Sequence, residues 1–121
     1  MTTVELTATD FEKTVNDNDI VFVDFWASWC GPCRMFAPTY EKAAGANPDI
    51  TFGKVDTEAE PALAAAAQIR SIPTLMAFKE GTLVFSQPGA LPAAALAEVI
   101  RAVREFDITH VASEADGQRS A

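Results

Sequence analysis

The sequence predicts a single α/β domain in which helices cover both faces of a mixed five-stranded sheet. The run from 20 to 27 is almost continuously apolar, as in a central strand that is buried on both faces. Apolar runs alternate with helical patterns in the order strand, helix, strand, helix, strand, helix, strand, strand, helix. The chain has 121 residues, and its 49% content of hydrophobic residues is enough for one domain with its own core.

Five short segments have the composition and bounds of strands. They are expected at 4–6, 20–27, 50–56, 75–78 and 83–85. Glu80 and Gly81 lie between the last two, and a two-residue connection with glycine is typical of a tight hairpin. The last two strands are therefore expected to pair in an antiparallel manner at one edge of the sheet.

The first two helices are predicted on either side of the central strand. Phe11 and Val15, four residues apart, share one face of a short helix that Thr7 or Thr9 is placed to cap. The second helix begins at 31–32, because proline fixes φ and lacks an N–H that would have no partner in the first turn.

Two further helices follow in the second half of the chain. Pro61 precedes an alanine-rich segment of high helix propensity, 62–68. The last helix opens at Pro92 and carries one apolar face, which comprises Leu96, Val99, Ile100, Val103 and Phe106. The segment 108–121 is polar and has no apolar face, so we expect a disordered tail after a domain that spans 1–107.

Charge and hydropathy exclude several classes of function. The formal net charge of −8 argues against a nucleic-acid surface and against binding to anionic lipid. The first ten residues lack the basic and apolar regions of a secretory signal, and no apolar run is long enough to span a bilayer. We expect a cytoplasmic protein that acts as a monomer and binds neither nucleic acid nor membrane.

Both cysteines of the chain, Cys30 and Cys33, lie where the central strand gives way to the second helix. Two thiols at this spacing can close and reopen a disulfide, and a helix N-terminus favours a thiolate on the first. A zinc site needs about four ligands, and the only histidine is His110 in the polar segment. A purely structural bridge across so short a loop would add little stability. Redox chemistry is therefore favoured over a metal or structural role.

Asp24 interrupts the apolar run of the central strand. Strand alternation puts it on the same face as Phe22 and Trp26, which predicts a buried acid. The residues alone leave open whether Asp24 is a satisfied core carboxylate or a functional acid. Lys54 shares a face with Phe52 in the next strand, and it could equally be solvated.

Several motifs together resemble the thioredoxin family over roughly Val4 to Asp107. They are Asp24 to Ala27, Trp29 to Cys33, Arg34-Met35, Pro38, Lys54 to Asp56, Ile72-Pro73-Thr74, Phe78 with Gly81, and Gly89-Ala90-Leu91. The resemblance implies a thioredoxin-like three-layer sandwich and a protein-disulfide reductase. Arg34 and Ser71 depart from it, since lysine and glycine are common at these positions.

The resemblance also implies a role for each residue around the cysteines. Cys30, outermost at the helix start, is the attacking thiolate, and Cys33 resolves the mixed disulfide. Asp24 removes the proton from Cys33, through a water, and Lys54 supports Asp24. Gly31-Pro32 favours a reductant, because neither residue places a cation beside the thiolate.

A shallow apolar groove for an extended substrate segment is implied as well. Its residues would be Trp29, Ile72, Pro73, Gly89 and Ala90, with backbone hydrogen bonds at Ile72. The family likewise implies a cis Ile72–Pro73 bond. For Trp29, the residues alone also allow a side chain that is simply part of the hydrophobic core.

The partners implied by the resemblance are disulfide-bonded substrate proteins and a thioredoxin reductase. That flavin-containing reductase would draw electrons from NADPH, so this chain itself is expected to bind no cofactor and no metal. Two alternatives remain: a dithiol oxidase or isomerase, and a subunit that uses the same groove to hold a partner without redox turnover.

Overall fold

The computed structural model describes residues 3–109, and its five strands form one mixed sheet in the order β1-β3-β2-β4-β5. The strands are β1 (Thr3–Glu5), β2 (Ile20–Trp26), β3 (Thr51–Asp56), β4 (Thr74–Lys79) and β5 (Thr82–Pro88). The central strand β2 runs parallel to β3 and antiparallel to β4. The predicted mixed five-stranded sheet is confirmed, with the apolar run at its centre.

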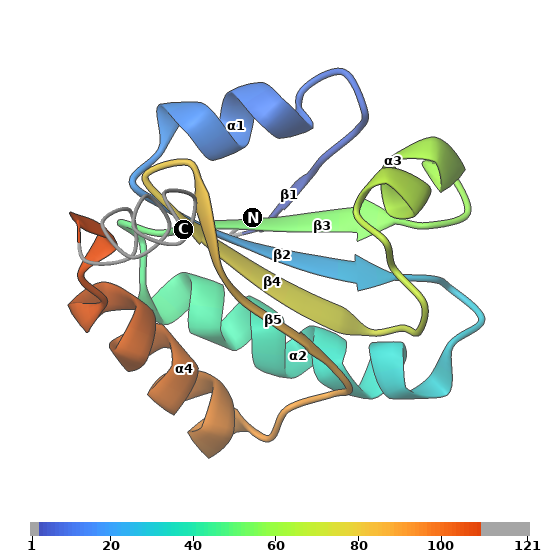
Figure 1. The fold of residues 1–121 in the computed structure, drawn as a ribbon. Helices are drawn as coiled ribbons and strands as arrows, with labels where there is room; N and C mark the ends of the chain where they lie inside the picture. Colours follow the sequence, from blue (N-terminus) through green and yellow to red (C-terminus); the bar gives the residue numbers. More distant parts are fainter. Residues whose placement is uncertain (1–2, 110–121) are drawn as a thin grey trace, which may run out of the picture.

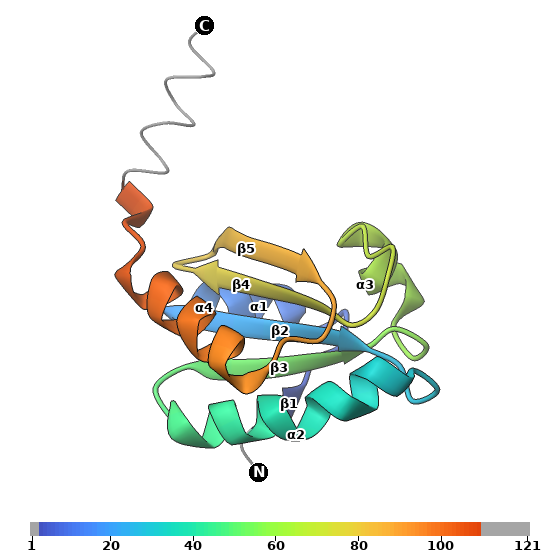
Figure 2. The same ribbon diagram turned by 90° about the horizontal axis from the view of Figure 1, so that it is seen from below.

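Four helices cover the sheet, two on each face (Figure 1). They are α1 (Phe11–Asp17), α2 (Gly31–Ala46), α3 (Pro61–Ala66) and α4 (Ala93–Glu105). Helices α2 and α4 pack on the face that carries Phe22 and Phe52, whereas α1 and α3 lie over Val23 and Val55 (Figure 2). Each face of the sheet therefore has its own apolar cluster, as the three-layer sandwich requires.

Two helix ends differ from the sequence-based expectation. Asp10, rather than Thr7 or Thr9, is the N-cap of α1, and its carboxylate accepts the N–H of Thr7 instead of capping the helix. Helix α4 ends at Glu105, and Phe106 is already extended. Both expectations were wrong by one to three residues, because several neighbouring residue types can cap a helix and the last turn of a helix frays.

The β4–β5 hairpin forms as predicted. Glu80 and Gly81 make the two-residue turn with φ of 51° and 82°, and Lys79 pairs with Thr82. Two successive positive φ values match the right-handed twist of the flanking strands. Of the predicted polar tail, residues 110–121 lie outside the described part of the chain, so the domain boundary at 107 stays a prediction.

Gly53 in the middle of β3 is enclosed on both faces of the sheet. The fully buried Tyr40 of α2 donates its hydroxyl hydrogen to the Gly53 carbonyl at 2.8 Å. On the other face, a Cβ added at this position would overlap the side chain of the buried Leu6. A glycine is therefore needed here for space and not for an unusual backbone conformation.

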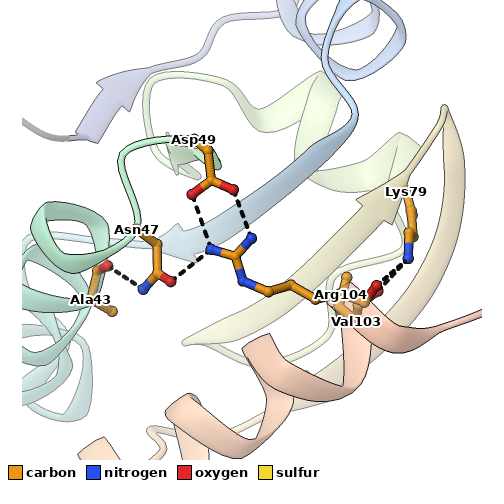
Figure 3. A network of polar contacts seen from close by, with 6 residues as sticks. All are labelled: Ala43, Asn47, Asp49, Lys79, Val103 and Arg104. Carbon is orange, nitrogen blue, oxygen red and sulfur yellow. Dashed lines mark hydrogen bonds and ion pairs between the residues drawn. The ribbon is translucent and has the colours of Figure 1, made fainter.

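A network of polar contacts fastens the C-terminal end of α4 (Figure 3). The Lys79 ammonium donates to the carbonyls of Val103, Arg104 and Phe106 at 2.9, 2.7 and 2.7 Å. The Arg104 guanidinium bonds both carboxylate oxygens of Asp49, at 2.6 and 3.0 Å. A cation at the carbonyl end of a helix offsets its dipole and satisfies carbonyls that lack helical partners.

We expect Lys79→Met to destabilise the protein by about 1–3 kcal/mol, because partly buried carbonyls lose a charged donor. Lys13→Met is the matched control, since Lys13 forms only an exposed pair with Asp17. Urea denaturation monitored by circular dichroism measures both changes. Equal losses of stability in the two variants would show that the cap on α4 contributes nothing of its own.

Candidate active site

The turn from β2 into α2 places both cysteines at the N-terminus of a helix. Cys30 is the N-cap residue of α2, and its backbone N–H donates to the carbonyl of Ala27 at 3.2 Å. Cys33 lies one turn later, with 5.2 Å between the two Cα atoms, and the two sulfurs form a disulfide. The short loop and the first helical turn thus fix the pair at bonding distance.

The N-terminus of α2 places the two sulfurs in different electrostatic environments. The Cys30 Sγ accepts the backbone N–H of Cys33 at 3.2 Å, in addition to lying at the positive end of the helix dipole. Both effects favour negative charge on Cys30. The expectation that Cys30 is outermost has little support from exposure, because Cys30 and Cys33 are only 4% and 2% exposed.

The Ile72–Pro73 loop lies against this sulfur. The carbonyl oxygen of Ile72 is 3.8 Å from the Cys30 Sγ, and the Ile72–Pro73 bond is cis, as predicted. The Pro73 carbonyl accepts the N–H of Gly89 at 2.7 Å, which joins two of the expected groove segments. The structure therefore brings together Cys30, Ile72, Pro73 and Gly89.

The remaining two groove candidates are on the surface. Trp29 is 63% exposed, which contradicts the interpretation of this side chain as plain core. Ala90 is exposed next to Gly89. Neither Trp29 nor Ala90 has a hydrogen bond to the cysteines within residues 3–109. Both are nevertheless free to contact a bound segment.

Asp24 is completely buried on the α2 side of the sheet. Neither of its carboxylate oxygens has a hydrogen-bond partner among the described residues, so it is not a satisfied core carboxylate. Burial raises the pKa of Asp24 to about 7, although the nearby charge of Lys54 acts in the opposite direction. An acid with this pKa can exchange protons near neutral pH.

Lys54 is the cross-strand neighbour of Asp24 in the parallel β2–β3 pair. Its ammonium lies 4.8 Å from the centre of the Trp26 ring. This cation–π contact keeps the positive charge of Lys54 near the end of β2 that leads to the cysteines. The Trp26 Nε1 is buried and has no hydrogen-bond partner within the described residues. The predicted proximity of Lys54 to Asp24 is thus present, and Lys54 keeps the pKa of Asp24 from rising further.

Two residues that position segments of the candidate site were missed by reasoning from the sequence. The Arg34 Nη1 donates to the carbonyl of Ser28 at 2.9 Å, which clamps the loop before Trp29 onto the first turn of α2. Tyr40 lies on the same helical face as Cys33 and Phe36, and its buried hydroxyl joins α2 to the strand that carries Lys54. Tyr40 follows Cys33 by seven residues, or two helical turns, so the sequence places it on the same helical face. A tyrosine hydroxyl that is buried on this face needs a hydrogen-bond partner, and this was the available signal.

Metal ligation and membrane insertion find no support in residues 3–109. That range contains no group of three or more His, Cys, Asp or Glu side chains arranged to hold a metal ion. His110 lies outside the described residues. None of the helices in the described range has the length and apolar character needed to cross a membrane.

Comparison with known proteins agrees with this geometry. Residues 2–102 match the family model for thioredoxin. Putative thioredoxin 2 of Streptomyces coelicolor is 62% identical over 109 residues, which cover 90% of this chain and 81% of that protein. Thioredoxin 1 of Synechococcus elongatus is 44% identical over 97 residues, which cover 78% and 91% of the two chains.

Solved structures show the same fold. A mutant thioredoxin from Halobacterium salinarum superposes with a TM-score of 0.79 at 34% identity, covering 87% of this chain and 92% of that one. The oxidised form of mitochondrial thioredoxin 3 from Saccharomyces cerevisiae gives 0.76 at 35% identity, with coverage of 82% and 93%. The chain belongs to the thioredoxin family, and its Cys30–Cys33 pair is the redox centre of a thiol–disulfide oxidoreductase.

Proposed function

We propose that this protein reduces disulfide bonds in other proteins, with Cys30 as the attacking thiolate. The observation that carries the proposal is the position of the Cys30 sulfur, which accepts the N–H of Cys33 at the N-terminus of α2. A helix N-terminus favours the thiolate that starts the exchange. Gly31 and Pro32 add no cation that would favour the reduced state further, which suits a donor of electrons.

The reaction proceeds in two exchanges. The Cys30 thiolate attacks one sulfur of the substrate disulfide, forms a mixed disulfide and releases the other substrate sulfur as a thiolate. Cys33 then loses its proton and attacks the Cys30 sulfur, which closes the internal disulfide and expels the second substrate thiolate. Two electrons have passed to the substrate, and two protons complete its dithiol.

Asp24 is the proposed acceptor of the Cys33 proton. Its carboxylate is buried on the same side of the sheet as α2, and its pKa of about 7 matches a base that works near neutral pH. Lys54 limits that rise in pKa and so keeps part of the Asp24 population ionised at neutral pH. Asp24 makes no hydrogen bond to Cys33 in the oxidised pair described, so we assign the transfer to an intervening water.

The substrate segment would lie across Trp29, Ile72, Pro73, Gly89 and Ala90. The Ile72 carbonyl is already 3.8 Å from the Cys30 sulfur, and Ile72 precedes β4 rather than lying within it. An extended segment that pairs with this backbone would bring its own sulfur towards Cys30. The exposed Trp29 ring offers apolar area beside that path.

The oxidised pair would be returned to the dithiol by a thioredoxin reductase, a flavoprotein that takes electrons from NADPH. The reductase would run the same two exchanges in reverse, since each attack of a thiolate on a disulfide is reversible. We place this cycle in the cytoplasm, where thiols are kept reduced.

Two measurements test the proposal. The protein should accelerate the precipitation of insulin by dithiothreitol, which a subunit that only binds a partner would not do. Its reduction potential against glutathione should be close to the value of about −270 mV typical of thioredoxins. A potential near −120 mV, typical of strongly oxidising relatives, would identify an oxidase and overturn the direction of the reaction.

A further inference from the structure

A pocket adjoins the Ile72–Pro73 loop on the face of the sheet covered by α3. It has a volume of about 290 Å³, and its walls come from the end of α3, β4 and β5. Ser71 and Pro88 line it, and each immediately precedes a groove residue, Ile72 and Gly89. The pocket therefore lies next to the two chain segments over which the substrate backbone is proposed to run.

Among the described residues that line this pocket, Arg70 alone is charged, and it is exposed. It forms no ion pair and no hydrogen bond within the described part of the chain. By contrast, Lys13, Arg101 and Arg104 pair with carboxylates, and Lys79 is occupied by helix carbonyls. An unpaired guanidinium is conspicuous in a protein with a net charge of −8.

The backbone holds Arg70 in place from both sides. Gln68 has φ of 60°, and the N–H groups of Gln68 and Ile69 both donate back to carbonyls of α3 at 3.0 Å. This is the Schellman pattern that ends a helix, and Ile69 then packs on the apolar cluster. After Arg70, the carbonyl of Ser71 accepts the Thr74 hydroxyl at 2.6 Å. The backbone that carries Arg70 is therefore held on both sides, so binding would not have to order this loop.

We propose that Arg70 and this pocket bind an acidic side chain that flanks the cystine of a substrate protein. The inference rests on the proposed disulfide reduction, whose substrate class it narrows. Arg70 is two residues from Ile72, so the acidic residue would lie within about two positions of the attacked cysteine, at roughly 3.3 Å per extended residue. Ser71 and Ser86 line the same pocket and carry hydroxyl donors for the second carboxylate oxygen.

Three cystine peptides that differ only in the residues flanking the attacked cysteine test this proposal. They carry glutamate, glutamine or lysine on both sides, so the direction of the bound segment does not matter. Turnover, as kcat/KM at low salt, is measured for the wild type and for Arg70→Gln, Arg70→Lys and Arg101→Gln. Arg101→Gln changes the net charge equally but lies on α4, where Arg101 pairs with Glu98.

We expect the wild type to favour the glutamate over the lysine peptide about tenfold, because attraction replaces repulsion at one charge. Arg70→Gln should reduce that ratio to about two or less, whereas Arg70→Lys and Arg101→Gln should keep it above about five. The glutamine peptide should be turned over at a rate within about twofold in all four proteins, since no charge is involved.

A binding measurement separates this proposal from the proposed function. Oxidised protein is titrated with the same peptides after their cysteines are replaced by serine, and tryptophan fluorescence reports the dissociation constant. A glutamate preference that Arg70→Gln removes would support the pocket even if no peptide were reduced. Turnover of all three peptides at equal rates, or a preference that survives Arg70→Gln, would overturn the pocket and leave disulfide reduction intact.

Discussion

We expect Cys30→Ser to abolish disulfide reduction, whereas Cys33→Ser should attack its substrate once and stay covalently joined to it. The difference follows from the helix N-terminus, which favours a thiolate on Cys30 and leaves Cys33 to resolve the intermediate. A serine hydroxyl is too weakly acidic to replace either thiolate. Incubation with a disulfide substrate followed by non-reducing gel electrophoresis shows the mixed disulfide directly.

The double variant with both cysteines replaced is the control, and it should form no adduct at all. The two single variants must also retain the melting temperature of the reduced wild type, so that loss of activity reflects chemistry. An adduct that accumulates on Cys30→Ser and not on Cys33→Ser would reverse the assignment of attacking and resolving thiols.

Asp24→Ala should make the oxidised protein more stable at pH 8 while it slows the release of substrate from the reduced protein. The pKa of Asp24 is raised from 3.8 to about 7 in the folded state, so the folded state binds more protons than the unfolded one between these values. The contribution of Asp24 to the free energy of unfolding is therefore greatest below about pH 4. It decreases as the pH rises to about 7 and is constant above that. At about 1.4 kcal/mol per pKa unit, the loss is about 4 kcal/mol.

Denaturant titrations of oxidised wild type and Asp24→Ala at pH 4 and pH 8 measure this effect without titration of the cysteines. The difference in unfolding free energy between the two proteins should move by about 4 kcal/mol in favour of the variant from pH 4 to pH 8. The cavity left by the substitution contributes equally at both pH values and cancels. A difference that does not change with pH would mean that the pKa of Asp24 is not raised in the folded protein.

The catalytic half of the same prediction uses single-turnover release of the mixed disulfide. In the wild type the rate should rise with pH with an apparent pKa near 7, as the Asp24 carboxylate becomes available to accept a proton. Asp24→Ala should lose that dependence. Resolution at the wild-type rate and with the wild-type pH profile would remove Asp24 from the mechanism.

The sequence predicted the fold well where a pattern is imposed by burial on both sides. The run from 20 to 27 has the pattern of a central strand, and β2 is indeed flanked by β3 and β4. Helix ends were less predictable, because Thr7, Thr9 and Asp10 are all residue types that can cap a helix and because the last turn of a helix frays. The bounds of β5 were similarly underestimated, since pairing with β4 extends it to Pro88.

The candidate site was predictable as far as its residues lie close in sequence or match a known motif. The cysteine pair, its helix and the buried acid all follow from one segment of the chain. The clamp from Arg34 to Ser28 and the open pocket at Arg70 were not foreseen. Both depend on where a long side chain points, which neither apolar periodicity nor residue spacing encodes.

Gly53 couples the side-chain volumes that are allowed at two positions far apart in the chain, 53 and 6. A side chain at 53 would collide with Leu6 on one face, while the carbonyl of the same residue must stay in reach of Tyr40 on the other. The strand therefore cannot simply shift to make room. A larger residue at position 53 becomes tolerable only together with a smaller one at position 6, so Gly53→Ala and Leu6→Ala should be individually harmful and mutually compensating. Epistasis between these positions would arise from volume alone, at a site that takes no part in the chemistry.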